Sequence, residues 1–485
     1  MKNGQYNNTA WTSCPDCLGR GKKSRRLRKK VRLNYQRALE QFEKSNGTGT
    51  APVRPKAHQY SCINCNGTGL VRTDSFPDVK VYPRVAIIGG GIGGTALAVA
   101  CLHRGIPFTL YERDSSFNER SQGYGLTLQQ ASKAIQGLGI TALKEGITST
   151  KHVVHTTDGT VIGEWGIRKW GDSKEKIYSK RTNVHIARQS LREELLDQLG
   201  GEDQVTWGHR LIDFKRNKND AIDLKFLVNG EEIIKTADLV VGADGIRSTT
   251  RKLLIGESPT PLRYLDCIVI LGICPLKSLN NLDHDLLDNA TVFQTANGKE
   301  RIYMMPYSTD TIMWQLSFPI SENEAKKLSE LGPAALKKEA MLRTQWHSPI
   351  PEIINATIEK QISGYPVYDR SLLDPEVLKN NSNATLIGDA AHPMSPFKGQ
   401  GANQALLDAL SLARAISIGC RPQSNWRETD LRAAVLNDFE KAMLERTASK
   451  VKDSAQAAQF LHSDVVLHKG DEPRGRILKR SDKKE

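Results

Sequence analysis

A chain of 485 residues is longer than one ordinary domain requires, so we expect two or three domains with a sizeable core. The 39% hydrophobic and 25% charged residues are typical of a soluble globular protein. The start, MKNGQYNNTAWTS, lacks the apolar centre of a signal peptide, and we expect a cytoplasmic protein. The only long uncharged run, residues 85–102, contains five glycines, which indicates a nucleotide-binding turn and argues against a membrane span.

The net charge of +14 is confined to the two ends of the chain. Residues 1–80 hold 16 Lys and Arg against 5 Asp and Glu, and residues 469–485 hold 7 against 4, so the remainder is neutral. Eight of the basic residues lie at 22–32, where an acidic protein or a nucleic acid would be bound. Only Tyr35 brings an aromatic ring to this segment, and a solvated helix face is the alternative interpretation.

Four of the eight cysteines form a repeated CxxCxGxG pattern near the N-terminus. The first copy contains Cys14 and Cys17, and the second contains Cys62 and Cys65. Paired CxxC without an export signal indicates metal binding, and four thiolates complete a tetrahedral site, so we expect one structural Zn²⁺. The alternative, two unrelated turns, requires the same eight-residue pattern twice by chance.

The residues between the two cysteine pairs are expected to form a helix and a return loop. Apolar residues at 22–44 are spaced along one helix face, and the Gly- and Pro-containing stretch 45–55 predicts a loop. The CxxCxGxG pairs resemble the zinc-binding region of J-domain chaperones. The chain has two copies where those chaperones have four, and it has no HPD tripeptide, so the resemblance implies a zinc module and not a chaperone.

The segment that begins at residue 84 predicts a strand, a glycine turn, a helix and a second strand. Gly89, Gly91 and Gly94 form GxGxxG between the first strand and the helix, where a dinucleotide pyrophosphate binds the helix N-terminus. Glu112 lies about twenty residues further on, at the end of the LYERD strand with Arg113, and suits the ribose hydroxyls of an adenosine.

Two further motifs follow strand-like segments. Asp244 ends ADLVVGADG, a pattern that alone predicts little more than a turn. The third motif, GDAAHPMSPFKGQGAN at 388–403, is more specific. Asp389 suits polyol hydroxyls, and the helix predicted to begin within 399–403 directs free N–H groups at an acceptor such as reduced flavin.

The three motifs, in this order and spacing, resemble the group A flavoprotein monooxygenases, the family of para-hydroxybenzoate hydroxylase, over roughly residues 84–455. The resemblance implies bound FAD, transient NAD(P)H without a second dinucleotide fingerprint, and flavin-contacting arginines at Arg120 and Arg188. His392 and Pro393 would lie near the flavin by analogy, although a buried structural histidine is an equal alternative. The expected cofactor-binding residues are Gly89, Gly91, Gly94, Glu112, Arg113, Arg120, Arg188, Asp244, Asp389, Pro396, Gly399, Gly401, Ala402 and Asn403.

The resemblance also implies a reaction, in which a flavin C4a-hydroperoxide transfers one oxygen atom from O₂ to an aromatic or polycyclic small molecule. The third motif is similar to that of tetracycline-inactivating monooxygenases, but this likeness concerns the flavin site and not the substrate. The GWxWxIP motif of flavin halogenases is absent. A zinc-containing adaptor or nucleic-acid-binding protein, or another FAD-dependent oxidoreductase, remains the alternative.

We therefore predict an α/β protein with a Rossmann-like FAD-binding domain, an inserted mixed β-sheet substrate domain and a small N-terminal zinc module. The expected boundaries are 1–80 for the zinc module, 81–256 and 376–462 for the FAD-binding domain, 257–375 for the substrate domain, and 463–485 for a charged tail without fixed structure.

Overall fold

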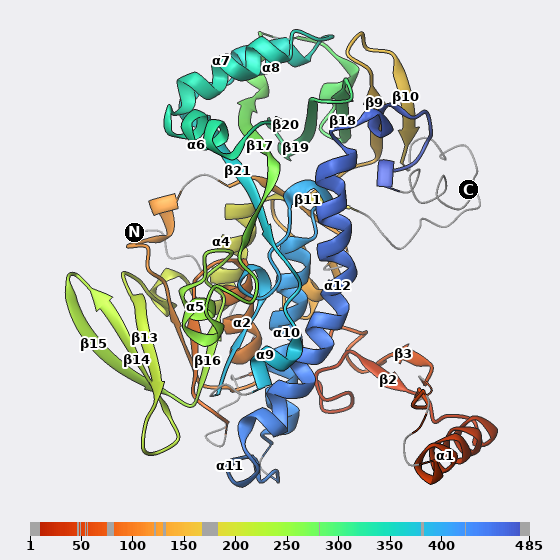
Figure 1. Cartoon of the computed structure of the whole chain (residues 1–485), viewed down its shortest axis with the longest axis vertical. Coiled ribbons are helices and arrows are strands. Elements are labelled where there is room, and N and C mark those ends of the chain that lie inside the picture. Colours follow the sequence, from red (N-terminus) through yellow and green to blue (C-terminus); the bar gives the residue numbers. More distant parts are fainter. Residues whose placement is uncertain are drawn as a thin grey trace. The chain divides into compact units, whose positions relative to one another are not determined.

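The chain divides into two compact units, Met1–Asp78 and Val79–Glu485 (Figure 1). No helix in the described part of the chain is long and apolar enough to cross a bilayer. The computed structural model describes residues 10–45, 48, 50–53, 55, 57–74, 82–120, 123–129, 132–166, 183–280, 282–379, 383–421 and 423–475.

The N-terminal unit consists of two short antiparallel sheets of two strands each and one helix. Strand β1 (Ala10–Ser13) pairs with β4 (Leu70–Thr73), and β2 (Lys22–Ser24) pairs with β3 (Gln59–Ser61). Helix α1 (Lys29–Lys44) is shorter than the predicted 22–44. The difference arises because residues 22–24 pair with the strand beside the second cysteine pair, which helical backbone could not do.

This unit has almost no apolar core. Its buried cluster consists of the four cysteines, with Val71 packed against them, and no residue of α1 is buried. Hydrophobic burial of this size cannot offset the conformational entropy of ordering sixty residues. The unit therefore requires another source of stability, which its cysteines can supply.

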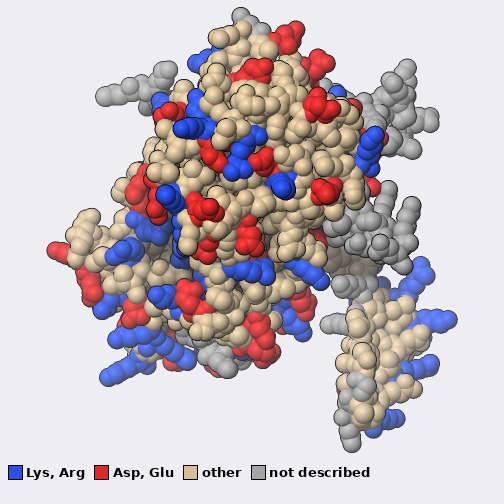
Figure 2. Space-filling model, turned by 45° about the horizontal axis from the view of Figure 1, so that its top comes forward, with Lys and Arg blue, Asp and Glu red and all other residues tan. Residues whose placement is uncertain are grey.

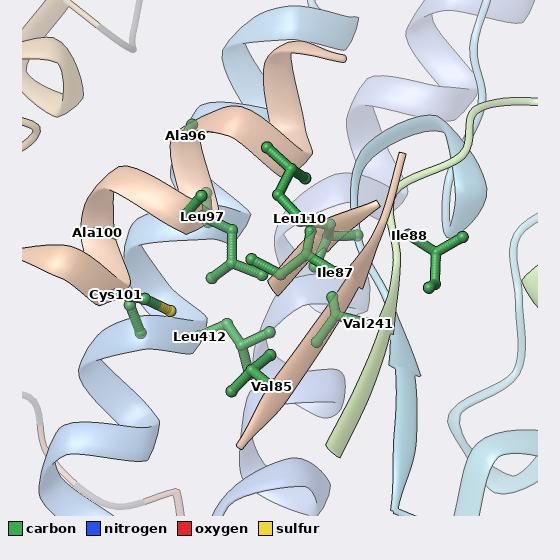
Figure 3. Close-up of a cluster of buried hydrophobic side chains, with 14 of the residues drawn as sticks. Val85, Ile87, Ile88, Ala96, Leu97, Ala100, Cys101, Leu110, Val241 and Leu412 are labelled. Carbon is green, nitrogen blue, oxygen red and sulfur yellow. The ribbon is translucent and has the colours of Figure 1, made fainter. Parts of the chain in front are cut away.

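The larger unit contains the predicted parallel nucleotide-binding sheet, in the strand order β12-β6-β5-β16-β22. Every residue of β5 is buried, and helix α2 packs against this strand. Figure 3 shows side chains of β5, α2 and α10 meeting in this core, with Cys101 among them. The elements are β5 (Val85–Ile88), α2 (Ile92–Leu102), β6 (Phe108–Tyr111), β12 (Val205–Thr206), β16 (Leu239–Gly242), β22 (Ala384–Leu386) and α10 (Gly401–Gly419).

A second, seven-stranded mixed sheet forms the upper part of the unit in Figure 1, in the order β10-β9-β18-β19-β20-β17-β21. Helices α6 and α7 pack on β21, and α8 packs on β17. The elements are β9 (Lys151–His155), β10 (Val161–Trp165), β17 (Leu262–Pro275), β18 (Thr291–Ala296), β19 (Arg301–Ser308), β20 (Thr311–Pro319), α6 (Glu322–Glu330), α7 (Pro333–Arg343), α8 (Ile350–Ala356) and β21 (Ile362–Arg370).

This sheet is larger than the predicted insertion at 257–375. Strands β9 and β10 come from residues assigned by sequence to the FAD-binding domain, and β9 pairs in parallel with β18. The second sheet is therefore built from two separated stretches of chain. Local sequence pattern does not show such pairing, because the partner strands are more than a hundred residues apart.

The remaining elements connect and cover the two sheets. Strands β7, β11 and β8 form a small antiparallel sheet, and β13-β14-β15 forms a separate antiparallel meander. The bounds are β7 (Gly125–Leu128), α3 (Ser132–Gln136), β8 (Ile147–Thr148), β11 (Val184–Ala187), α4 (Arg188–Leu199), β13 (Arg210–Arg216), β14 (Ile222–Val228), β15 (Glu231–Ala237), α5 (Thr249–Ile255), α9 (Pro375–Lys379), α11 (Trp426–Thr429) and α12 (Asn437–Phe460).

The C-terminal segment 463–475 packs on the second sheet, in contrast to the structureless tail predicted from its charge. Val466 is fully buried, and the Gly470 N–H donates to the Ile162 carbonyl of β10 at 3.0 Å. The Glu164 N–H donates to Asp471 Oδ1, also at 3.0 Å. Hydrogen bonds to an edge strand outweigh the composition of this segment, whereas 476–485 lie outside the described residues.

Candidate functional site

The glycine turn between β5 and α2 has the geometry that GxGxxG requires. Gly89 has φ +107°, and a Cβ on Gly94 would lie 1.9 Å from the Gly89 carbonyl oxygen. If Gly91 carried a Cβ, the nearest atom to it would be Arg188 Nη2 at 3.9 Å, so the turn is open at this residue. No side chain caps the start of α2, and its free N–H groups are available to a pyrophosphate.

Two charged side chains hold the glycine turn in place by hydrogen bonds. Glu112 accepts hydrogen bonds from the Gly90 N–H at 2.7 Å and from the Asp114 N–H at 3.1 Å. Arg192 donates from Nε to the Gly90 carbonyl at 2.7 Å and is 7% exposed. Sequence reasoning missed Arg192 because a helical arginine carries no local sign that it points inward. Arg113, in contrast, is half exposed and does not line the cavity described below.

Asp244 holds its own turn together. Its carboxylate accepts from the Thr250 N–H and hydroxyl, both at 3.0 Å, and from the Ser248 hydroxyl at 2.5 Å. Burial raises the pKa of this carboxyl, and the three hydrogen bonds oppose that effect. The neighbouring Gly245 and Arg247 line the cavity, whereas Asp244 itself does not.

Asp389 and the start of α10 face the open cavity. No described residue donates a hydrogen bond to the Asp389 carboxylate, so its lone pairs are available to a ligand. Burial raises its pKa, while His392 and Arg188 act in the opposite direction. Gly401 and Ala402 line the cavity at a helix start that no side chain caps, and such a start favours negative charge.

Buried polar contacts hold the turn at residues 388–392 against α10 and α12. Asp408 is fully buried and accepts from the Gly388 N–H at 2.8 Å, from His392 Nε2 at 2.7 Å and from Arg446 Nη2. His392 is thus a buried structural histidine and does not line the cavity. Asn403 bridges the helix start to strand β7 by accepting from the Gln129 N–H and donating to the Thr127 carbonyl, both at 2.8 Å.

One cavity of about 630 Å³ connects the glycine turn to the second sheet. Alternate residues of β19 point to opposite sides: Tyr303 and Met305 line the cavity, whereas Ile302 and Met304 join the core under α6–α8. His152 and Trp165 stack in the wall with ring centroids 5.3 Å apart. These residues were not predicted, because period-two alternation identifies two faces without showing which one meets a cofactor.

The charged residues of the cavity wall are mostly basic. Asp389 is the only carboxylate that lines the cavity among the described residues. Burial lowers the pKa of Arg301 to about 10, and no described carboxylate forms an ion pair with it. The basic lining residues are Arg188, Arg247, Arg301, Lys398 and Arg474.

Most predicted cofactor residues lie in or directly behind this cavity. Gly91, Arg188, Asp389, Pro396, Gly399, Gly401 and Ala402 line it. Gly89, Gly94, Glu112, Asp244 and Asn403 build the turns behind it. Arg120 ends a short 3-10 helix, Phe117–Arg120, and its side chain lies outside the described part.

The four predicted metal ligands lie together in the N-terminal unit. Their sulfur atoms are all within 4.8 Å of one another, with Cys14 and Cys62 at 3.9 Å and Cys17 and Cys65 at 3.7 Å. The Gly21 N–H donates to Cys17 Sγ at 3.2 Å, and the Gly69 N–H donates to Cys65 Sγ at 3.3 Å. The four sulfurs could hold one metal ion.

An open GxGxxG turn, a carboxylate without a described hydrogen-bond donor and an uncapped helix start all face one cavity, an arrangement that suits a dinucleotide cofactor. The chain belongs to the FAD binding domain family, whose model matches residues 82–425. It is an enzyme of the FAD-dependent monooxygenase type, and both its relatives and its fold agree with this class.

The chain is 29% identical to aurachin C monooxygenase/isomerase of Stigmatella aurantiaca over 74% of this chain and 88% of that protein. It is 28% identical to 3-amino-4-hydroxybenzoate 2-monooxygenase PtnB3 of Streptomyces platensis, over 68% and 78%.

Solved structures show the same fold. A single-residue variant of HpxO from Klebsiella pneumoniae, complexed with FAD, has a TM-score of 0.64 at 20% identity, over 83% of this chain and 93% of that one. The tetracycline destructase Tet(51) has a TM-score of 0.54 at 19% identity, over 84% and 95%. At this identity the likeness establishes the fold and nothing about the substrate.

Proposed function

We propose that the protein uses FAD, NAD(P)H and O₂ to insert one oxygen atom into an aromatic or polycyclic small molecule. The observation that carries the proposal is the single cavity that joins the flavin-type turn at Gly91 to an aromatic wall at His152 and Trp165. A flat substrate in this wall would meet the flavin ring without crossing solvent. The 3-amino-4-hydroxybenzoate monooxygenase among its relatives, by its name, acts on an aromatic acid.

The residues present fit FAD. The open turn at Gly91 suits the pyrophosphate, the unpaired Asp389 carboxylate suits the ribityl hydroxyls, and the start of α10 at Gly401 suits the negative charge of a reduced ring. Bound FAD would supply the redox chemistry by taking a hydride from NAD(P)H and activating O₂. The chain's own part is to position the substrate, exclude water and stabilise charge.

NAD(P)H is proposed to bind only transiently. The chain has one dinucleotide fingerprint, Gly89 to Gly94, and FAD would occupy it. We therefore expect slow NAD(P)H oxidation in the absence of substrate and a faster rate when a suitable aromatic compound fills the cavity. The rate increase provides a substrate screen that works before any product has been identified.

The test uses the purified full chain loaded with FAD. Phenols, quinolones and polycyclic polyketides are screened for stimulated NAD(P)H oxidation, and hits are repeated under ¹⁸O₂ with mass spectrometry of the products. We expect one labelled oxygen atom in the organic product. Label found only in water and peroxide, or a halogenated product, would overturn the oxygenation reaction, and a chain that takes up no FAD would overturn the cofactor.

We also propose that the N-terminal unit holds one structural zinc ion at its four cysteines. Zn–S bonds of about 2.3 Å place tetrahedral sulfurs roughly 3.8 Å apart, whereas a disulfide requires about 2.05 Å. The Cys14–Cys62 and Cys17–Cys65 separations of 3.9 and 3.7 Å agree with the first value. Metal analysis should give one zinc per chain, and a chain without residues 1–78 should contain none while still binding FAD.

A further inference from the structure

The basic segment, residues 22–32, is almost free of compensating charge. It contains eight Lys and Arg and no Asp or Glu. Of these eight residues, only Lys23 has an ion-pair partner among the described residues, and this partner is Asp16 at 2.7 Å. Figure 2 shows this unit at the lower right with basic groups and no acidic groups on the visible face. The positive charges of these side chains repel one another, and this repulsion destabilises the free unit. An anionic partner would therefore reduce the repulsion as well as form contacts.

The structure adds an aromatic ring that the linear sequence does not place beside this segment. Strand β2 pairs with β3 so that Lys23 lies opposite Tyr60. The Arg25 guanidinium carbon lies 5.8 Å from the Tyr60 ring centroid, and Tyr60 is 38% exposed. A solvent-facing ring flanked by cations is the arrangement on which an unpaired base stacks while its phosphates are neutralised.

The start of α1 extends the same surface. Lys29, Lys30 and Arg32 occupy its first turn, which holds no acidic residue, and no side chain caps its N-terminus. Cations at this end oppose the helix dipole, which favours anions there. The helix therefore begins where both its backbone N–H groups and its side chains would interact favourably with phosphate.

We propose that the basic segment, together with Tyr60, binds single-stranded nucleic acid. Phosphates along the strand would contact the cations of β2 and of the α1 start, and a base would stack on the exposed ring. This inference concerns the N-terminal unit alone and does not depend on the oxygenation reaction.

Nucleic acid fits this surface better than the other polyanions. Every nucleotide of a strand carries one phosphate, a regular charge density that an acidic protein reaches only in long carboxylate runs. A membrane would require an apolar face inserted beside the cations. Val31 and Leu33 are the large exposed hydrophobic side chains of α1, and two such side chains form too small an apolar face for stable insertion.

The test is a fluorescence anisotropy titration of the full zinc- and FAD-loaded protein. The probes are 20-nucleotide poly(U) and poly(dT), a 20-base-pair duplex of mixed sequence, poly-glutamate of equal charge, and phosphatidylserine vesicles. We expect the single strands to bind most tightly and their affinity to fall steeply between 50 and 200 mM salt. Absence of single-strand binding at 50 mM salt, or equal affinity for poly-glutamate or vesicles, would overturn the proposal.

Substitutions locate the surface. Arg25→Gln, Arg26→Gln and Arg28→Gln combined should weaken single-strand binding and reduce the slope of log K against log salt by about 2, since each phosphate contact contributes about 0.7. Tyr60→Leu should weaken single-strand binding roughly 5- to 150-fold and leave duplex binding nearly unchanged. Unaltered binding in both variants would overturn the proposal.

The matched control removes three cations elsewhere. Lys215, Arg216 and Lys218 are exposed at the β13–β14 turn, and changing them to Gln alters the net charge equally. This control should bind as the wild type does. If it loses affinity as strongly as the Arg25 variant, binding follows net charge and the assigned surface is wrong. Zinc content is measured for each variant, and Arg→Lys at the same three positions should restore binding.

Discussion

The two units of this chain are stabilised in different ways. The N-terminal unit buries four cysteines and little else, whereas the larger unit buries a continuous apolar core around its parallel sheet. With the proposed zinc ion in place, stability of the first kind would depend on one metal ion and would be lost in a single step when a ligand is removed. Stability of the second kind is distributed over many contacts, so single changes have graded effects.

The largest expected effect is in the N-terminal unit. Cys14→Ser should release the zinc and unfold residues 10–74, because structural zinc contributes about 10–16 kcal/mol in comparable small sites. Metal analysis and amide hydrogen exchange provide the measurements. Cys101→Ala is the matched control, since its thiol is buried in the larger unit and should leave zinc unchanged. Retained zinc in the Cys14 variant would show that the unit does not depend on four ligands.

A buried ion pair should give the next largest effect, this time in the larger unit. Asp408→Asn should lower the free energy of unfolding by about 3 kcal/mol, because Arg446 loses its charged partner and is itself partly exposed. Asp197→Asn is the control, because its pair with Lys144 is exposed and should contribute less than about 1 kcal/mol. Equal changes in denaturant midpoint for the two variants would contradict the assigned role.

Asp389→Ala should separate cofactor binding from folding. The carboxylate has no hydrogen-bond donor among the described residues, so apo stability should change little. The FAD dissociation constant should rise roughly 10- to 150-fold, which corresponds to about 1.5–3 kcal/mol for a lost charged hydrogen bond. Fluorescence titration with FAD measures the change. A variant that binds FAD normally, or one that fails to fold, would contradict this distinction.

The smallest expected effect depends on pH. Burial lowers the pKa of His103 to about 3, below its ordinary value of 6.5. As pH falls, the unfolded chain therefore binds a proton at His103 before the folded chain does. The stabilisation that comes from keeping this imidazole buried and neutral is complete above pH 6.5 and is lost as pH falls toward 3. At pH 5.5 the loss is about 1.4 kcal/mol. Unfolding at pH 7.5 and 5.5 should show a weaker pH dependence in His103→Asn, and an unchanged dependence would contradict the assignment.

The sequence predicted the features that depend on short stretches of chain. The glycine turn at Gly89 to Gly94 and the cysteine pairs follow from backbone sterics and ligand geometry within a few residues. The α/β class and the strand before each motif agree with the structure. The roles of the individual cofactor residues and the domain boundaries stay predictions, although the cavity brings most of those residues together.

The features that the sequence did not predict depend on distant partners. Strands β9 and β10 join the second sheet through pairing with β18, and Arg192 turns inward to a carbonyl about a hundred residues earlier. Asp408 lies on an apolar helix, where an acidic residue usually indicates a solvent-facing position. Its burial becomes clear only from its partners in the structure, which are the Gly388 N–H, His392 and the arginine of α12.

The position of the segment Pro473–Gly475 in the cavity wall has a consequence for the timing of biosynthesis. Translation produces the glycine turn nearly four hundred residues before this wall. At about 5–20 residues per second, a ribosome needs on the order of 20 to 80 seconds to cover that stretch. During this interval the cavity of the nascent chain still lacks the part of its wall that Pro473–Gly475 supply. Fusion partners are accordingly better attached to the N-terminal unit than beyond residue 475.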